Sequence, residues 1–253
     1  MNEFPLPLHP NILGEQNTPK REQFDKISLN IISYLELFPE ITKIDFSVSN
    51  NKSWNEVIAW EKKNFPYKIP FDMKEYYSIF NGLKFSWKID LSGKLTTIGD
   101  ISLLPINEIS RIPMEGQFHS LNRPEPDIKN SASFVFDILE NIPSYRLVLM
   151  YRQPNNQVSA QASTRVITKD GLKISREIKG YDNPEIWLQD SSLKWYFIAD
   201  SFTQYLRLAV SHLGIIGWQN AFTTSGLSPG TQLWMRIFCK ERLLMDLNNK
   251  INP

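Results

Sequence analysis

Seven tryptophans are spread along this chain, and they constrain its fold more than any other feature. They lie in or beside segments whose apolar residues recur with helical or strand spacing. We expect most of them in the hydrophobic core, because such large side chains are stabilised by burial. One or two are expected at a partner surface, where tryptophan and tyrosine contribute much of the binding energy. The seven are Trp54, Trp60, Trp87, Trp187, Trp195, Trp218 and Trp234.

Length and charge narrow the class of protein. A chain of 253 residues buries roughly 70–75% of the surface that its unfolded form exposes, so it needs no disulfide or metal to fold. Its 28 basic and 27 acidic residues lack the basic excess typical of a duplex-binding protein. No apolar run reaches the roughly 18 residues that span a bilayer, and the N-terminus does not follow the secretory pattern. We expect a soluble, cytoplasmic protein with no nucleic-acid or membrane partner.

The single cysteine, Cys239, follows the apolar stretch 233–238. It cannot form an internal disulfide, and no histidine lies near it in the sequence. We expect a buried free thiol, which fits a reducing compartment.

Two kinds of hydrophobic periodicity predict a mixture of helices and strands. Ser92-Gly93 predicts a tight hairpin, and Ser228-Pro229 predicts a helix start with a capping serine and a proline at the first helical position. The expected fold class is α+β, with a central, mostly antiparallel sheet and N- and C-terminal helices. Helices are predicted over residues 22–38, 53–64, 71–80, 200–213 and from 228 onward, and strands over 41–48, 85–89, 95–98, 133–139, 146–151, 185–189 and 193–198.

The domain organisation follows from the absence of an internal repeat or a linker between two cores. Residues 1–20 contain four prolines and predict an extended N-terminal arm. Residues 21–245 predict a single domain that includes a C-terminal helical layer, and residues 246–253 predict a short tail. The polar stretch 113–131 predicts a loop.

Motifs for catalysis are missing from the sequence. The glycines form neither a phosphate-binding loop nor a dinucleotide-binding pattern, and no G-x-S-x-G is present. His9, His119 and His212 are far apart, and none pairs with another histidine or with the cysteine at metal-ligand spacing. We predict no catalytic residue, no cofactor and no metal site.

Three polar side chains are predicted to stabilise local structure. Glu61, in the middle of a predicted helix, is expected to accept hydrogen bonds from the loop before Pro70. Asp200 is expected to cap the start of the next helix. His212 is expected near the end of that helix, where a donor or a cation is favourable.

The segment around Trp218 is the first candidate for a partner surface. Trp218 with Ile215, Ile216 and Phe222 is expected to form an exposed apolar patch on a short element. The alternative is that this segment belongs to a C-terminal helical layer packed on the sheet.

Residues between 57 and 106 follow a pattern of a helix with Trp-Glu, an Ile-Pro step, a second helix and Asn-Gly. The residues are Val57-Ile58-Ala59-Trp60-Glu61, Ile69-Pro70, the stretch 71–80, Asn81-Gly82, Gly99 and Leu103-Leu104-Pro105-Ile106. This pattern resembles the SMI1/KNR4 (SUKH) superfamily. The resemblance implies an α+β domain used for protein binding.

The C-terminal half carries a second resemblance, over a long, ordered series of residues rich in rare types. The series is Glu185-Ile186-Trp187, Trp195-Tyr196-Phe197, Asp200-Ser201-Phe202-Thr203, Tyr205-Leu206-Arg207-Leu208, His212-Leu213-Gly214, Trp218-Gln219, Ala221-Phe222-Thr223 and Gly226-Leu227-Ser228-Pro229. It resembles the tubulin polyglutamylase complex subunit 2 family, and with the SUKH segment it covers roughly residues 29–238.

This second resemblance implies a non-catalytic scaffold. Its complex adds glutamate to tubulin tails with ATP, through a tubulin-tyrosine-ligase-like catalytic subunit. The implied partners are that subunit, the other polyglutamylase subunits and, through the complex, tubulin and microtubules. The implied locations are the cytoskeleton, the centriole or basal body, and the cilium. The alternatives are a stand-alone SUKH-type binding module and an unrecognised enzyme, which would need a deep pocket with converging polar groups.

Overall fold

One strand and a hairpin build the first sheet. The computed structural model describes residues 18–49, 54–119, 126–139, 145–152, 181 and 183–251. In it, β1 (Ile41–Ser49), β2 (Asn81–Leu91) and β3 (Lys94–Leu103) pair antiparallel in that order. Ser92 and Gly93 have φ angles of 55° and 84°, the left-handed values that a two-residue hairpin turn needs. The predicted hairpin is therefore confirmed, with longer strands than the sequence indicated.

The second sheet has six strands in the order β4-β6-β7-β8-β9-β5. All neighbours are antiparallel except β5, which runs parallel to β9. The mostly antiparallel α+β fold is confirmed, but its strands are divided between two sheets instead of one. The strands are β4 (Ser110–Ile112), β5 (Gln117–His119), β6 (Ala132–Ile138), β7 (Arg146–Tyr151), β8 (Glu185–Gln189) and β9 (Lys194–Ala199).

Strand β5 lies inside the stretch that was predicted to be a loop. Its central residue, Phe118, stacks on Trp195 with ring centroids 5.6 Å apart and meets Trp187 edge-on. Burial of these rings holds the short strand on the sheet, so the loop prediction is wrong for residues 117–119. Residues 120–125 of that stretch lie outside the described part of the chain.

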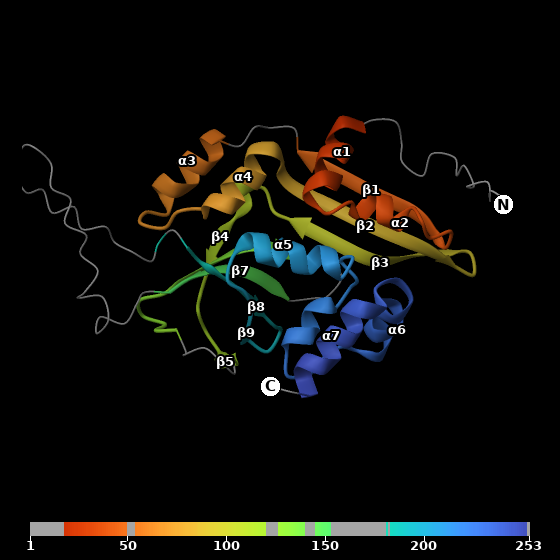
Figure 1. Ribbon diagram of the computed structural model, residues 1–253. Helices are drawn as coiled ribbons and strands as arrows, with labels where there is room; N and C mark the ends of the chain where they lie inside the picture. The colour runs from red at the N-terminus through yellow and green to blue at the C-terminus, as the bar shows by residue number, and fades with distance from the viewer. Residues whose placement is uncertain are drawn as a thin grey trace, which may run out of the picture.

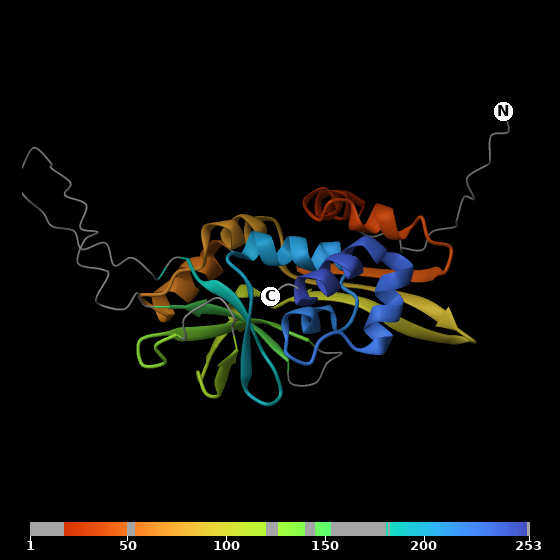
Figure 2. The same cartoon turned by 60° about the horizontal axis from the view of Figure 1, so that its bottom comes forward.

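The helices pack around the two sheets (Figure 1). Helices α4 and α5 lie side by side in both views (Figures 1 and 2), while α6 and α7 form a separate C-terminal pair. The helices are α1 (Thr18–Ile27), α2 (Ile31–Leu35), α3 (Trp54–Lys63), α4 (Phe71–Ile79), α5 (Phe202–Ser211), α6 (Pro229–Phe238) and α7 (Lys240–Ile251), with 3-10 turns η1 (Ile106–Glu108) and η3 (Trp218–Phe222).

The helix predicted over residues 22–38 is broken in two. Leu29 and Asn30, between α1 and α2, have φ angles of 56° and 61°, which no right-handed helix can contain. Asp25 stabilises the break, because its carboxylate accepts hydrogen bonds from the backbone N–H groups of Ile32 (2.8 Å) and Ser33 (3.2 Å) at the start of α2. Periodicity alone does not reveal such a break, since the apolar stripe continues across it.

Helix starts in the C-terminal half follow capping chemistry closely. Ser228 caps α6 by accepting from the N–H of Thr231, with Pro229 at the first helical position, as predicted. The cap of α5 is Ser201, which accepts from the N–H of Gln204, so the prediction that Asp200 caps this helix is wrong by one residue. The Gln204 side chain accepts in return from the N–H of Asp200, one residue before the cap, so the pair resembles a capping box shifted by one residue.

Both chain ends differ from the predicted domain boundaries. Helix α1 begins at Thr18, inside the predicted arm, and residues 1–17 lie outside the described ranges. Helix α7 runs to Ile251, so the predicted tail from residue 246 begins within a helix, and Asp246 is buried. The predicted helix start at Ser53 also lies outside the described residues.

Most of the tryptophans are in the core, as predicted. Five of them are buried, Trp234 is half-buried and Trp54 is exposed. The second sheet has buried side chains on both faces, and Trp187 and Trp195 belong to a smaller cluster that is separate from the main core. The buried five are Trp60, Trp87, Trp187, Trp195 and Trp218.

A close approach between Gly99 and Trp87 joins the first sheet to the C-terminal layer. The Trp87 indole N–H donates to the carbonyl of Leu213 at 2.8 Å. An added Cβ at Gly99 would lie 1.8 Å from Trp87 Nε1, so only glycine lets the indole cross the strand here. On either side of Gly99, Asp100 N–H donates to the carbonyl of Gly214, and Ile216 N–H donates to that of Ile98.

We expect Gly99→Ala to lower the free energy of unfolding by about 3 kcal/mol, because the new methyl group must displace the buried indole. Gly230→Ala is the control, since its Cβ would meet nothing closer than 3.9 Å and alanine favours a helix by up to about 1 kcal/mol. Urea denaturation of both variants measures the difference. Equal stability of the two would show that the close approach does not constrain the fold.

Candidate functional site

The predicted patch around Trp218 is mostly internal. Ile215 and Trp218 are only 0% and 1% exposed, and Ile216 and Phe222 are half-buried. The expectation of an exposed apolar surface is therefore wrong for Ile215 and Trp218. Packing of a C-terminal layer on the sheet, the alternative, is confirmed. Contact of Ile216 and Phe222 with a partner stays a prediction.

Backbone pairing explains why this segment is buried. Ile215 forms an antiparallel bridge with Gly99, so the segment adds to the open edge of β3. Trp218 then lies over His212, with ring centroids 4.5 Å apart and the rings nearly parallel. The sequence signal for an exposed aromatic element is the same as that for a buried one, because both are short and apolar.

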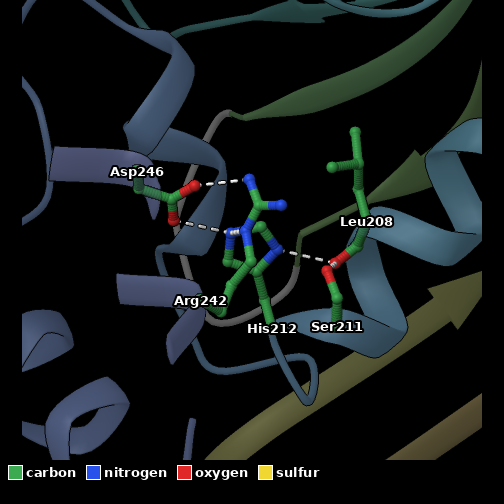
Figure 3. A network of polar contacts seen from close by, with 5 residues as sticks. All are labelled: Leu208, Ser211, His212, Arg242 and Asp246. Atoms are coloured by element: carbon green, nitrogen blue, oxygen red, sulfur yellow. Dashed lines mark hydrogen bonds and ion pairs between the residues drawn. The ribbon is translucent and has the colours of Figure 1, made fainter. Parts of the chain in front are cut away.

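A buried polar cluster joins α5 to α7 (Figure 3), and the Trp218 ring stacks on its histidine, His212. His212 Nδ1 donates to the carbonyl of Leu208 at 2.6 Å, and Nε2 lies 2.8 Å from Asp246 Oδ2. Arg242 approaches the same Nε2 through its Nε at 3.1 Å and pairs with the other oxygen of Asp246. His212 is also the residue that ends α5, so its predicted role as a donor at the helix end is confirmed.

The chemistry of this cluster is that of a structural clamp. The Leu208 carbonyl can only accept, so Nδ1 carries a proton. Nε2 lies between the Arg242 guanidinium and the Asp246 carboxylate, within hydrogen-bond distance of both. Ser211, the neighbouring hydroxyl, donates to the Leu208 carbonyl instead of contacting Nε2 (Figure 3). The cluster therefore lacks the nucleophile–base hydrogen bond that defines a catalytic pair.

The other histidines do not join this cluster. His119 lies on β5, stacked on Tyr196, and His9 lies outside the described residues. Within the ranges that the structure describes, no three His, Cys, Asp or Glu side chains are grouped to hold a metal. None of the described helices is both long and apolar enough to cross a membrane.

Glu61 lies on α3 and accepts a hydrogen bond from the loop before Pro70, as the sequence predicted. Its carboxylate accepts from the backbone N–H of Ile69 at 3.1 Å, directly before Pro70. The same oxygen forms an ion pair with Lys74 of α4 at 2.6 Å. Glu61 thus connects α3, the Ile69-Pro70 step and α4, which explains why these residues occur together in the sequence motif.

Two apolar surfaces are exposed on helices. On α3, Trp54 and Ile58 lie one turn apart and face solvent, and Phe65 beyond the helix end is 80% exposed. The buried side of the same helix carries Val57 and Trp60. The second surface is on the C-terminal helix pair and consists of Leu233, Ile237, Leu244 and Met245.

The exposed apolar residues on α3 and on the C-terminal helix pair were not predicted from the sequence. Of the seven tryptophans, Trp54 is the exposed one, at 56%, and the sequence favoured Trp218. Helical spacing does not give this signal, because Trp54 stands three residues before the buried Val57, and residues three apart lie beside each other on a helix.

Three curated proteins are similar to this chain over most of its length. The human protein named tubulin polyglutamylase complex subunit 2 is 26% identical over 238 residues, which cover 86% of this chain and 71% of that protein. The rat protein of the same name is 25% identical over 239 residues, which cover 94% of this chain and 76% of that protein. The mouse protein is 25% identical over 230 residues, with coverage of 88% and 76%.

This chain is similar to tubulin polyglutamylase complex subunit 2. The resemblance seen in the C-terminal half of the sequence is thereby confirmed. No protein-family model matches the chain, so its membership of the SUKH superfamily stays a prediction. No solved structure matches it.

We expect Asp246→Ala to lower the free energy of unfolding by about 3 kcal/mol, because His212 and Arg242 lose the buried carboxylate between them. Asn248→Ala, an exposed position on the same helix, is the control and should change stability by less than about 0.5 kcal/mol. Thermal or urea unfolding measures both. A small effect of Asp246→Ala would mean that the cluster does not hold α7 in place.

We expect Cys239 to react slowly with a thiol reagent in the folded protein. Burial raises the pKa of this thiol from its ordinary value to about 12, with a further increase from the nearby Asp246 carboxylate, so little thiolate exists at pH 8. The unfolded chain loses this proton at lower pH than the folded chain, so stability should fall as pH rises from about 9 towards 12. Reaction with Ellman's reagent with and without urea tests this, and fast labelling of the folded protein at pH 8 would contradict it.

Proposed function

We propose that this chain is a non-catalytic accessory subunit of a tubulin polyglutamylase complex, in which it helps to assemble or target a tubulin-tyrosine-ligase-like catalytic subunit. The observation that carries the proposal is the similarity, over 86–94% of this chain, to three mammalian proteins named as subunit 2 of that complex. A name that identifies a protein as a numbered subunit points to assembly with other chains.

The exposed surfaces support a role in assembly. Trp54, Ile58 and Phe65 are large apolar side chains in solvent on one helix and its following turn. A second group lies on α6 and α7. Aromatic and aliphatic residues exposed together are a feature of subunit interfaces, where they become the buried centre of the contact.

The partners follow from this role. They are the catalytic subunit and the other polyglutamylase subunits, and the chain reaches tubulin and microtubules through the complex. The corresponding location is cytoplasmic, at the cytoskeleton, the centriole or basal body, and the cilium.

A stand-alone SUKH-type binding module with a different partner is the second candidate. The contacts of Glu61 with Ile69 and Lys74 favour it, because they give a structural reason for the residues of the SUKH pattern. This candidate shares the binding role with the first and differs in the partner.

Purification of the tagged chain from its native cells, followed by mass spectrometry and a tubulin glutamylation assay, distinguishes the candidates. We expect a tubulin-tyrosine-ligase-like enzyme to co-purify, with activity in the eluate and none in the recombinant chain alone. Activity of the isolated chain would contradict a non-catalytic role. Recovery of unrelated partners would favour the SUKH-type module.

A further inference from the structure

A groove of about 250 Å³ lies between α4 and α5 and is completed by the end of α1. Its floor is apolar, with Ile79 from α4 and Leu206 and Val210 from α5. In both views these two helices are neighbours (Figures 1 and 2). The groove is separate from the apolar surfaces on α3 and on the C-terminal helix pair.

The two walls of the groove are firmly connected at one end. Asp72, near the start of α4, accepts a hydrogen bond from the N–H of Thr203, near the start of α5, at 2.8 Å. Beside this contact the rings of Tyr76 and Phe202 meet edge-on, 5.5 Å apart. Both helices therefore begin at the same end of the groove and run in the same direction, with a fixed spacing between them.

Opposite charges stand on the two walls. Glu75 lies on α4 and Arg207 lies on α5, and both are exposed lining residues. In the described part of the chain neither side chain forms an ion pair. Two exposed, opposite charges on either side of an apolar floor are complementary to a segment that carries apolar residues between a basic and an acidic one.

Leu29, at the rim of the groove, has an unusual backbone conformation. It has a φ angle of 56°, which is unfavourable for leucine, and its side chain is 67% exposed. A leucine in this position gains nothing for the folded chain from its apolar side chain, and asparagine would adopt the backbone conformation more easily. Leu193 and Leu213 have similar φ angles in other turns, so it is the exposure of Leu29 at the rim of the groove that makes it a candidate contact residue.

We propose that this groove binds an amphipathic helix from another subunit of the polyglutamylase complex, with an apolar stripe on the floor, a basic residue beside Glu75 and an acidic residue beside Arg207. The proposal rests on the proposed function for the identity of the partner. The groove itself specifies the chemistry of the segment.

The shape of the groove favours a helix over the other possible occupants. Its volume is below the roughly 300–1,000 Å³ of most small-molecule sites and suits one or two apolar side chains. Its walls are helices, so an extended peptide finds no strand edge to pair with. A third helix fits the valley between two packed helices, where its side-chain ridges enter the groove.

Three substitutions test the groove without disturbing the core. Glu75→Arg and Arg207→Glu place like charges against the incoming segment, and Leu29→Asn removes the rim side chain. We expect each to weaken binding of the chain to the co-expressed remaining subunits of the complex, by about tenfold for the charge reversals. We also expect Leu29→Asn to keep or raise the Tm of the free chain, because asparagine tolerates a left-handed backbone, so stability and affinity change in opposite directions.

Matched controls lie outside the groove. Glu108→Arg and Lys94→Glu reverse exposed charges that neither line the groove nor lie on α3, and Leu37→Asn replaces a leucine that is 71% exposed and is not a lining residue. These controls should bind like the wild type. Ile58→Glu tests the apolar surface on α3 as the competing binding site. Loss of binding by this variant, together with normal binding by the groove variants, would overturn the proposal.

The remaining outcomes separate this proposal from the proposed function. If the wild-type chain binds and the groove variants bind equally well, the groove is not the binding site, and the proposed accessory role is unaffected. Failure of the wild-type chain to bind any subunit would overturn both. Deletion of residues 1–17 should leave binding unchanged. If the deletion increases binding, and Glu75→Arg abolishes that increase, the chain's own arm is the occupant of the groove. This result would overturn the proposal.

Discussion

The hydrogen bond from the Trp87 indole to the carbonyl of Leu213 is the contact on which the arrangement of this protein depends. It joins residues 126 positions apart in the sequence, and it exists because Gly99 leaves room for the indole. A buried indole N–H needs an acceptor, and the carbonyl at the end of α5 supplies it. The C-terminal helices are thereby attached to the first sheet, and the polar cluster of His212, Arg242 and Asp246 attaches α7 to them in turn.

This internal attachment decides which surfaces remain for a partner. The segment after α5 is used to extend the edge of β3, so Ile215 and Trp218 become core residues. The outward sides of α3, α4 and α5 are left in contact with solvent. The groove between α4 and α5 combines an apolar floor with exposed charges of opposite sign on its walls, and both properties contribute to specific recognition of a helix.

Local chemistry was predictable from the sequence, and contacts between distant segments were not. The hairpin at Ser92-Gly93, the start of α6 at Ser228 and the contact of Glu61 with the loop before Pro70 follow from residues close in sequence, and all three are confirmed. The break after α1 was missed, and the sequence left open whether Trp218 is buried or exposed. The break and the burial depend on Asp25 reaching across a turn and on a strand edge far away in the chain, and periodicity carries no information on either.

By itself the sequence determined the fold class, most of the secondary structure, a core built on tryptophans and the resemblance to a complex subunit. These follow from apolar spacing, capping residues and rare side chains, all of which act over a few positions. The tertiary structure alone decided that the strands form two sheets, that Trp54 and not Trp218 faces solvent, and that Glu75 and Arg207 stand across a groove. Whether an apolar side chain is core or surface depends on what packs against it, and that is settled only when segments far apart in the chain come together.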